Sequence, residues 1–258
     1  MTEIHPTAIV GESAEVGDDC FIGPYSLIGP DVRLGAGVRV DAHAVIDGNT
    51  SIGDGTRIFP FVSIGLQPQD LKYGGEKTRT VIGKQNQIRE FVTIHRGTAG
   101  GGGVTTIGDG NLLMAQAHVA HDCVVGNEVI MANAATLAGH VEVADRANIG
   151  AYSGVHQYCR VGREAFVGGY SVVVKDALPF ATIQGNHARC YGLNRVGMKR
   201  RGYPAKVIGD LNHAFRLLLS SKLNTTQAIE RIREEIEDCA EVDLLVEFIE
   251  SSSRGVVK

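Results

Sequence analysis

Four of the nine histidines lie between residues 118 and 156, and one of them is followed directly by a carboxylate. The adjacent pair is His121 and Asp122. A neutral imidazole, with an unperturbed pKa of about 6.5, can accept a proton at neutral pH, and an adjacent carboxylate can orient the ring and stabilise the imidazolium. The chemistry of this pair then depends on which elements bring the other histidines beside it.

An aliphatic residue recurs every sixth position through the first quarter of the chain, a period that matches neither a helix nor a simple strand. The run consists of Ile4, Val10, Val16, Ile22, Ile28, Leu34, Val40, Ile46, Ile52, Ile58 and Ile64. Glycine often follows the aliphatic residue, as at Gly11 and Gly17, and is expected to turn the chain where the backbone dihedrals are demanding. Each hexad is therefore predicted to be a short strand plus a corner. Three hexads close a triangular coil of eighteen residues, and successive coils stack at about 4.8 Å.

The six-residue register continues from Ile82 to Ile94, slips by one residue and then holds from Ile107 to Val173. Two segments interrupt it, residues 66–81 and the Gly-rich residues 95–106. Both are predicted to be loops that project from the prism. Loops that interrupt a regular solenoid usually serve binding, and a tolerated insertion is the alternative.

After about residue 186 the apolar spacing becomes helical, over residues 205–219 and 228–249. The candidate N-cap residues of the second helix are Asn224, Thr225 and Thr226, and Pro204 suits the first turn of the first helix. A small helical domain is therefore expected to cover the last coil and its exposed edge, which a solenoid needs to have capped.

With 258 residues the chain has room for a β-helix over residues 1–186 and a helical domain over residues 187–258. A net charge of -4 argues against a general nucleic-acid binder. Five scattered cysteines without a C-x-x-C pair argue against a zinc or redox motif and suit a reducing compartment. No apolar stretch approaches the length of a membrane span and the chain does not begin like a signal peptide, so a cytoplasmic protein is expected.

Residues eighteen apart lie above one another on stacked coils, which makes the neighbours of the histidines predictable. One predicted column holds His121, Gly139 and Gln157, the adjacent column holds Asp122, His140 and Tyr158, and His118 and His156 lie next to them. Three interpretations of this cluster compete. The imidazoles can be partly buried polar groups, they can ligate zinc as in the carbonic anhydrases of this architecture, or one of them can be a general base.

The local sequence favours the general base. Asp122 can orient His121, and Gly139 offers a backbone N–H one coil along. A base, an orienting carboxylate and an oxyanion donor together suit acyl transfer.

The motifs around these residues carry a specific resemblance. They read AHVAHDCVVGN, LAGHV, VHQYCRVG, QGNHA and GMKRRG, together with DLKYGGEKTR and VTIHRGT. The set closely resembles the bacterial UDP-N-acetylglucosamine O-acyltransferases that open lipid A biosynthesis, and the likeness extends over nearly the whole chain. It implies a left-handed parallel β-helix and a homotrimer with active sites between subunits. It also implies transfer of an (R)-3-hydroxyacyl group from acyl carrier protein to the 3-hydroxyl of UDP-N-acetylglucosamine, without a metal or a dissociable organic cofactor.

The resemblance assigns roles position by position. His121 matches the general base, Asp122 the residue that orients it and Gly139 the oxyanion donor. The positions that match contacts to the sugar and the acyl chain are Asp70, Lys72, His118, His140 and His156. The positions that match contacts to the nucleotide and its phosphates are Gln157, His187, Asn194 and Arg200.

Gly169 matches the position that acts as a hydrocarbon ruler in the family, and its missing side chain implies an acyl group longer than ten carbons. A corner glycine is the alternative. Lys199 and Arg201, which flank Arg200, are candidate contacts to the acidic carrier protein, and a solvated helix start is their alternative.

Three other functions remain open at this stage. One is the related N-acyltransferase of the same pathway, another is a zinc-dependent lyase like carbonic anhydrase, and the third is a scaffold without chemistry.

Overall fold

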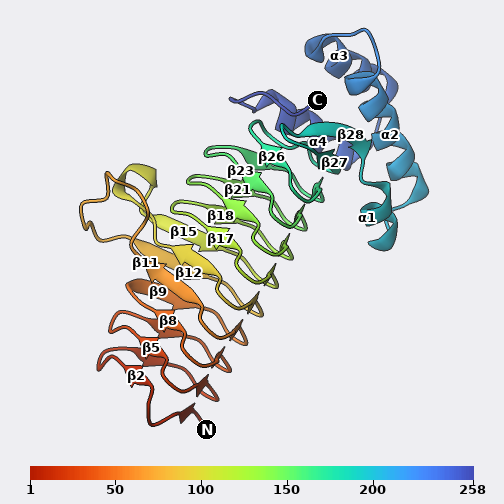
Figure 1. The fold of residues 1–258 in the computed structure, drawn as a ribbon. Coiled ribbons are helices and arrows are strands. Elements are labelled where there is room, and N and C mark those ends of the chain that lie inside the picture. The colour runs from red at the N-terminus through yellow and green to blue at the C-terminus, as the bar shows by residue number, and fades with distance from the viewer.

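The computed structural model describes residues 1–258, and a stacked prism of short parallel strands dominates it (Figure 1). The strands form sheets of eleven, nine and eight members, here named A, B and C. From β1 to β26, consecutive strands along the chain belong to A, B and C in turn. The coil is a left-handed parallel β-helix, as the resemblance implied. The turn from a strand of sheet B to the next strand of sheet C is called the BC corner, and the AB and CA corners are named in the same way.

The strand bounds are as follows. Sheet A contains β1 Glu3–Ile4, β4 Phe21–Ile22, β7 Arg39–Val40, β10 Arg57–Ile58, β13 Gln87–Ile88, β16 Leu112–Leu113, β19 Ile130–Met131, β22 Asn148–Ile149, β25 Phe166–Val167, β27 Ala181–Gln184 and β28 Arg189–Leu193. Sheet B contains β2 Ile9–Val10, β5 Leu27–Ile28, β8 Val45–Ile46, β11 Ser63–Leu66, β14 Thr93–His95, β17 His118–Val119, β20 Thr136–Leu137, β23 Gly154–Val155 and β26 Val172–Val173. Sheet C contains β3 Glu15–Val16, β6 Arg33–Leu34, β9 Asn49–Ile52, β12 Arg79–Ile82, β15 Val104–Ile107, β18 Val124–Val125, β21 Glu142–Val143 and β24 Arg160–Val161.

The strand register confirms the eighteen-residue coil. Ile4 pairs with Ile22, and Ile22 pairs with Val40, both in parallel. The second residue of each strand points into the prism, where Ile22 and Val40 are fully buried. The core is therefore a column of aliphatic side chains, one layer per coil.

The glycines that follow these aliphatic residues have a different role from the expected one. The backbone turns at the corners with positive φ at residues such as Tyr25 and His140, and among these glycines only Gly65 has a positive φ. A Cβ at Gly11 would lie only 2.6 Å from the Cα of Pro30, one coil away. Apart from Gly65, these glycines are needed because adjacent coils approach closely there, and for them the prediction that they turn the chain was wrong.

Both predicted loops are present, with shorter bounds. The strands on either side extend into the predicted segments, so the first loop covers residues 67–78 and the second covers residues 96–103. The second loop contains a 3₁₀ turn, η1 Ala99–Gly101. Both leave the prism at the BC corner of successive coils and project from the same edge (Figure 1).

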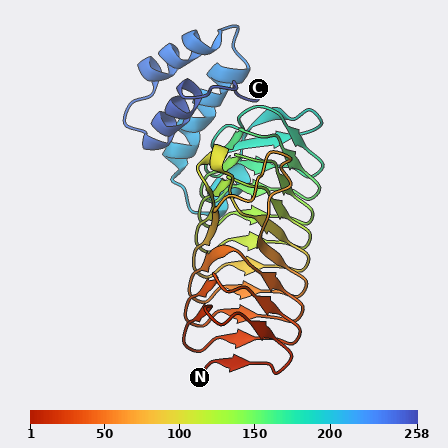
Figure 2. The ribbon, with the colours of Figure 1, turned by 90° about the vertical axis from the view of Figure 1, so that its left-hand side faces the viewer.

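The chain leaves the prism through an antiparallel pair, β27 and β28, before any helix begins. Four helices follow: α1 Arg195–Arg200, α2 Ala205–Leu219, α3 Thr225–Glu235 and α4 Ala240–Glu250. They lie against one side of the end of the prism (Figure 2). The predicted helical segment from residue 187 therefore starts too early, because residues 189–193 extend sheet A instead.

The predicted helix over residues 205–219 is confirmed as α2, with Pro204 directly before its first residue rather than in its first turn. Asn224 caps α3 through a capping box with Gln227. The single helix predicted over residues 228–249 is wrong, because the backbone is extended at Ile236 and Cys239 and separates α3 from α4. None of the helices combines the length and the apolar character that crossing a bilayer requires.

Candidate active site

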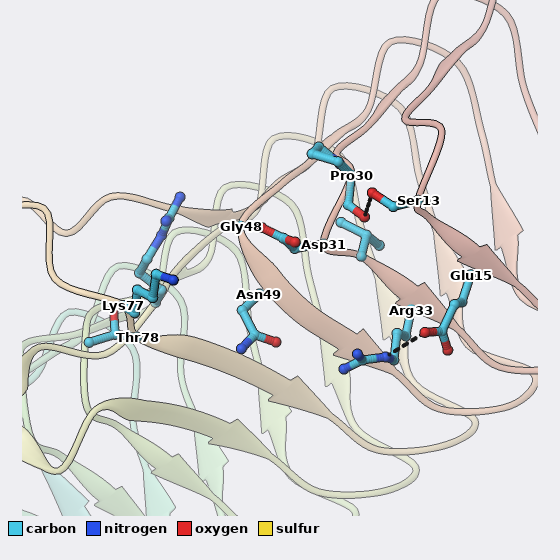
Figure 3. Close-up of a pocket in the computed structure, with 11 residues that line it drawn as sticks. Ser13, Glu15, Pro30, Asp31, Arg33, Gly48, Asn49, Lys77 and Thr78 are labelled. Atoms are coloured by element: carbon cyan, nitrogen blue, oxygen red, sulfur yellow. Dashed lines mark hydrogen bonds and ion pairs between the residues drawn. The ribbon is translucent and has the colours of Figure 1, made fainter.

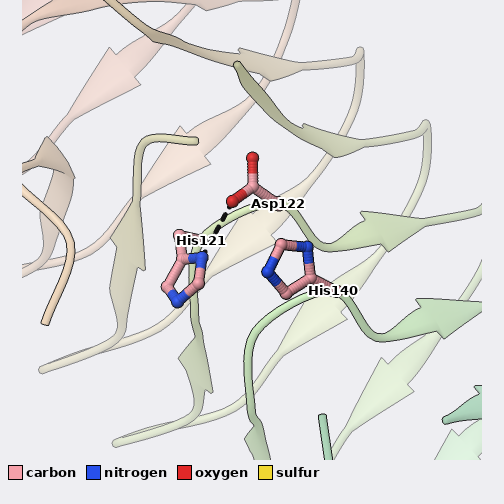
Figure 4. Close-up of side chains that lie close together, drawn as sticks. All are labelled: His121, Asp122 and His140. Carbon is pink, nitrogen blue, oxygen red and sulfur yellow. Dashed lines mark hydrogen bonds and ion pairs between the residues drawn. The ribbon is translucent and has the colours of Figure 1, made fainter. Parts of the chain in front are cut away.

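His121 and Asp122 form the centre of the histidine cluster, at the BC corner after β17 (Figure 4). Nδ1 of His121 lies 2.8 Å from Oδ2 of Asp122. The Asp122 side chain is fully buried, while that of His121 is 16% exposed. The carboxylate thus fixes one ring nitrogen, and Nε2 is left as the nitrogen available to a substrate.

The second loop holds Asp122 in place. The Thr98 N–H donates to both carboxylate oxygens, at 2.9 and 3.1 Å, and the Thr98 hydroxyl donates to Oδ2 at 2.6 Å. Gly97 and Gly101 pack so closely against the carboxylate that a Cβ at either position would collide with it. The glycines of this loop therefore let the backbone approach Asp122. Thr98 was not among the predicted residues, although it ends the motif VTIHRGT and begins the Gly-rich part of its loop.

Two further imidazoles flank this pair. The His140 ring meets the His121 ring edge-on at 5.1 Å, and Tyr158 stacks on its other side at 4.4 Å. His118, on β17, has its Nδ1 2.7 Å from the hydroxyl of Thr93. Burial lowers the pKa of both His118 and His140, so both rings are neutral at neutral pH.

The predicted column is confirmed by backbone contacts between coils. The His140 N–H donates to the carbonyl of His121 at 3.1 Å, and the Tyr158 N–H donates to that of Gly139 at 3.2 Å. The negative charge of Asp70, on the first loop, acts to raise the pKa of His140, although burial outweighs it. Asp70 therefore lies near the cluster.

Gly139 has a steric role as well as the predicted electronic one. Its φ is not positive, so the backbone does not require glycine there. A Cβ would instead lie 2.6 Å from Cε1 and 2.7 Å from Nε2 of His121. The Gly139 N–H donates no hydrogen bond within the chain, which leaves it free for a ligand beside the base nitrogen.

His156 and Gln157 occupy the next coil at the same corner, and both are exposed. Nδ1 of His156 lies 3.2 Å from the carbonyl of Gln157 and 3.4 Å from the guanidinium of Arg254. Lys72 is also exposed, and its N–H donates to Oδ1 of Asp70 at 3.0 Å. These three residues extend the cluster along the corner and onto the first loop.

The predicted nucleotide residues near α1 lie at a different corner. Asn194 is buried and caps α1 through the Gly197 N–H at 3.0 Å, and its amide donates to the carbonyl of Glu164 at 3.1 Å. Glu164 belongs to the CA corner, whereas the histidines belong to the BC corner. A single chain therefore does not bring α1 to the histidine cluster, and the Asn194 side chain is already engaged.

The basic run at the end of α1 is divided in its contacts. Lys199 and Arg200 are exposed and make no ion pair, whereas Arg201 pairs with Glu164 at 3.1 Å and with Glu128 at 3.2 Å. Arg201 thus joins α1 to the CA corner. The remaining basic charge that a partner can reach comes from the other two residues.

Two other predicted residues lie outside the cluster in a single chain. His187 is exposed in the turn between β27 and β28. Gly169 is half-buried at the AB corner, where the positive φ belongs to Tyr170. The φ of Gly169 does not require glycine, but a Cβ there would lie 3.2 Å from the carbonyl oxygen of Ala151 on the preceding coil, so the corner-glycine alternative stays open.

The donor set does not suit a zinc site. Ligand atoms of His121, Asp122 and His140 lie within 4.8 Å of one another. The carboxylate, however, already accepts hydrogen bonds from Thr98 and faces Nδ1 of His121. A metal would have to displace these contacts, while a structural or catalytic zinc site uses ligands that are free to point at the ion.

A hollow of about 470 Å³ lies elsewhere on the prism, at lower coils (Figure 3). Its lining residues are Ser13, Glu15, Pro30, Asp31, Val32, Arg33, Gly48, Asn49, Lys77, Thr78 and Arg96. It has mixed charge, with Arg33 paired to Glu15 at 3.1 Å, and contains no histidine. The histidine cluster is therefore the better candidate for acid–base chemistry.

Comparisons with known proteins identify the family to which the chain belongs. The family model described as UDP N-acetylglucosamine O-acyltransferase, domain 2, matches residues 176–257, and the model of bacterial transferase hexapeptide repeats matches residues 13–48 and 104–139. The acyl-[acyl-carrier-protein]--UDP-N-acetylglucosamine O-acyltransferase of Burkholderia orbicola is 52% identical over 262 residues, which cover 100% of both chains. The protein of that name from Myxococcus xanthus is 49% identical over 258 residues, again covering 100% of both.

Solved structures give the same result. A UDP-N-acetylglucosamine acyltransferase from Bacteroides fragilis superposes with a TM-score of 0.97 at 37% identity, covering 99% of this chain and 100% of that one. Identity of this extent over full-length relatives, with a shared fold, establishes the family. The chain belongs to the acyl-[acyl-carrier-protein]--UDP-N-acetylglucosamine O-acyltransferases.

Proposed function

We propose that this protein transfers an (R)-3-hydroxyacyl group from acyl carrier protein to the 3-hydroxyl of UDP-N-acetylglucosamine, the first step of lipid A biosynthesis, in the cytoplasm. The observation that carries the proposal is the His121–Asp122 pair beside the unpaired N–H of Gly139. The names of the full-length relatives supply the two substrates. The hydrogen bonds that already engage Asp122 argue against a metal, and the proposed reaction itself calls for no organic cofactor.

In the proposed mechanism the two ring nitrogens of His121 have different roles. Asp122 holds Nδ1, so Nε2 takes the proton from the sugar 3-hydroxyl as its oxygen attacks the thioester carbonyl. The Gly139 N–H then donates to the oxyanion of the tetrahedral intermediate. Collapse of the intermediate breaks the carbon–sulfur bond, and the imidazolium returns its proton to the leaving thiolate, which regenerates the base.

The surrounding residues bind the substrates in this proposal. Asp70, Lys72, His118, His140 and His156 contact the sugar and the acyl chain, and Gln157, His187 and Arg200 contact the nucleotide. Asn194, whose side chain caps α1, acts on the nucleotide by holding the helix that carries Arg200. The acyl chain passes Gly169, whose missing side chain accommodates a chain longer than ten carbons. Lys199 offers an exposed positive charge to the acidic carrier protein, and Arg201 contributes less because Glu128 and Glu164 neutralise it.

The separation of the BC and CA corners supports a site completed by a second copy of the chain. Arg200 and the histidines leave different corners of one prism, so both can face one substrate only if α1 comes from a neighbouring subunit. A homotrimer with three such clefts satisfies this requirement. Chains carrying His121→Ala and chains carrying Arg200→Ala, each inactive alone, are then expected to recover activity when they are coexpressed, because some clefts receive two intact halves. Activity that stays at the level of the separate variants contradicts a shared site.

One assay separates the proposal from its alternatives. The purified protein is given UDP-N-acetylglucosamine and 3-hydroxyacyl carrier proteins of different lengths, and the product is identified by mass before and after mild alkali. The expected product is an ester that alkali cleaves, formed equally well after treatment with a chelator. A parallel reaction with an acceptor sugar nucleotide whose 2-amino group is free tests the N-acyltransferase, which would form an alkali-stable amide there; UDP-N-acetylglucosamine itself cannot, because its nitrogen is already acylated. A CO2 hydration activity that the chelator abolishes indicates the lyase, and binding without product on either acceptor indicates a scaffold.

A further inference from the structure

His95, in the motif VTIHRGT, is a buried imidazole that has no role in the proposed mechanism. It ends β14, two residues after Thr93, and only 7% of its surface is exposed. Strand alternation places Thr93 and His95 on the outer face of sheet B, while Ile94 between them points into the core. A polar ring on the outer face of a sheet is normally exposed to solvent. Its burial here is unexpected, because burying a polar group without hydrogen-bond partners is unfavourable.

The environment of His95 leaves it few functions other than packing. Its Nδ1 is sealed from solvent without a hydrogen-bond partner. Burial, reinforced by the proximity of His118 and His121, lowers its pKa to about 4. The ring is thus neutral at neutral pH and cannot act as a general acid or as an anion-binding cation.

The ring contacts His118. The two ring centroids are 5.0 Å apart with an interplanar angle of 75°, the edge-to-face geometry that aromatic pairs prefer. The Thr93 hydroxyl holds Nδ1 of the same His118 at 2.7 Å. A single hydrogen bond leaves rotation of an imidazole about χ2 loosely defined, since that torsion has broad minima. The edge of His95 supplies the second constraint.

We infer that His95 is a positioning residue, which fixes the ring of His118 through its shape so that Nε2 of His118 faces the substrate. The inference rests on the proposed function in one respect, because the effect on turnover requires that His118 contacts the substrate. It assigns a second task to β14, whose Thr93 and His95 together clamp one side chain of the next coil. It also accounts for an enclosed imidazole whose nitrogens bind nothing within the chain.

The test compares two substitutions of similar volume. His95→Phe keeps the aromatic edge and removes both nitrogens, whereas His95→Leu removes the edge. His95→Leu is expected to lower kcat/KM for UDP-N-acetylglucosamine about tenfold, and His95→Phe to stay within about threefold of the native value, on the strength of one edge-to-face contact. Exposed His5 provides the control, and His5→Ala should have no effect. Thermal melting verifies that each variant is folded.

A second readout does not depend on turnover. The His118 signals in the NMR spectrum of protein labelled with ¹⁵N-histidine should shift or broaden in His95→Leu and remain native-like in His95→Phe. A His95→Phe variant as impaired as His95→Leu overturns the inference, since the nitrogens then matter, and so do unchanged His118 signals in His95→Leu. Shifted His118 signals with native turnover support the positioning role and refute instead the participation of His118 in the proposed reaction.

Discussion

Replacing Gly139 by alanine adds a single methyl group at the place occupied by the His121 ring. The new Cβ would lie 2.6 Å from Cε1 and 2.7 Å from Nε2, whereas carbon atoms in contact prefer about 3.5–4.0 Å. The ring must therefore move by about 1 Å, because the Cβ is fixed to the backbone of the coil. The backbone itself accepts alanine, since the φ of Gly139 is not positive.

The expected cost falls mainly on catalysis. Nε2 is the nitrogen that takes the proton in the proposed mechanism, and a displacement of about 1 Å at a reacting group costs on the order of a hundredfold in rate. That factor corresponds to about 2.7 kcal/mol of transition-state stabilisation. Crowding in a packed coil also lowers stability by about 1–3 kcal/mol, which a melting curve measures separately.

The assay is the turnover number of Gly139→Ala with saturating UDP-N-acetylglucosamine and 3-hydroxyacyl carrier protein. Gly209→Ala on α2 is the matched control, because its Cβ meets no atom within 4 Å and its activity should be native. In a His121→Ala background the methyl group finds open space, so the double variant should lose no more activity than His121→Ala alone. A folded Gly139→Ala protein with turnover within about threefold of native would refute the steric reasoning.

Three further outcomes follow from the same geometry. Thr98→Val removes the hydroxyl that donates to Asp122 at 2.6 Å, so it should lower the free energy of unfolding by about 1.5–3 kcal/mol and turnover by about tenfold. Thr78→Val is the control, because the Thr78 hydroxyl has no partner, and it should change neither quantity. In the folded chain the pKa of His95 is about 4, whereas in the unfolded chain the ring takes up a proton below about pH 6.5. The stabilisation that the neutral His95 ring provides is therefore complete above about pH 6.5 and is lost as the pH falls toward 4. Denaturant titrations should show a loss of up to about 3 kcal/mol over that range which His95→Phe lacks, and equal slopes would contradict it. Gly169→Met should shift the preferred donor toward shorter acyl chains in a competition between carrier proteins, and an unchanged preference would remove Gly169 from the acyl groove.

The sequence was sufficient to predict the prism and the part of the site that lies on stacked coils. A burial requirement that repeats every six residues leaves a periodic trace, and the eighteen-residue coil then places His121, Gly139 and His140 together by arithmetic. The loops have no period, so the grip of Thr98 on Asp122 could not be derived from spacing. The glycine at 139 was predicted for its N–H, while its steric fit to the ring required coordinates.

The C-terminal part departed further from prediction, for physical reasons that a linear pattern does not contain. The antiparallel return of β28 depends on the free edge of sheet A, which is a tertiary feature. The break between α3 and α4 occurs at Ile236, an apolar residue that keeps the helical spacing but has extended dihedrals. The engagement of Asn194 as a helix cap likewise follows from the contact of α1 with the CA corner.

The most direct test of the account compares native protein with His121→Ala in the formation of 3-O-acylated UDP-N-acetylglucosamine, followed by mass spectrometry under single-turnover conditions. A general base predicts that the variant folds, binds both substrates and forms the ester at least about a hundredfold more slowly. Ester formation by His121→Ala at a rate within a few-fold of native would contradict the assignment of His121 as the base.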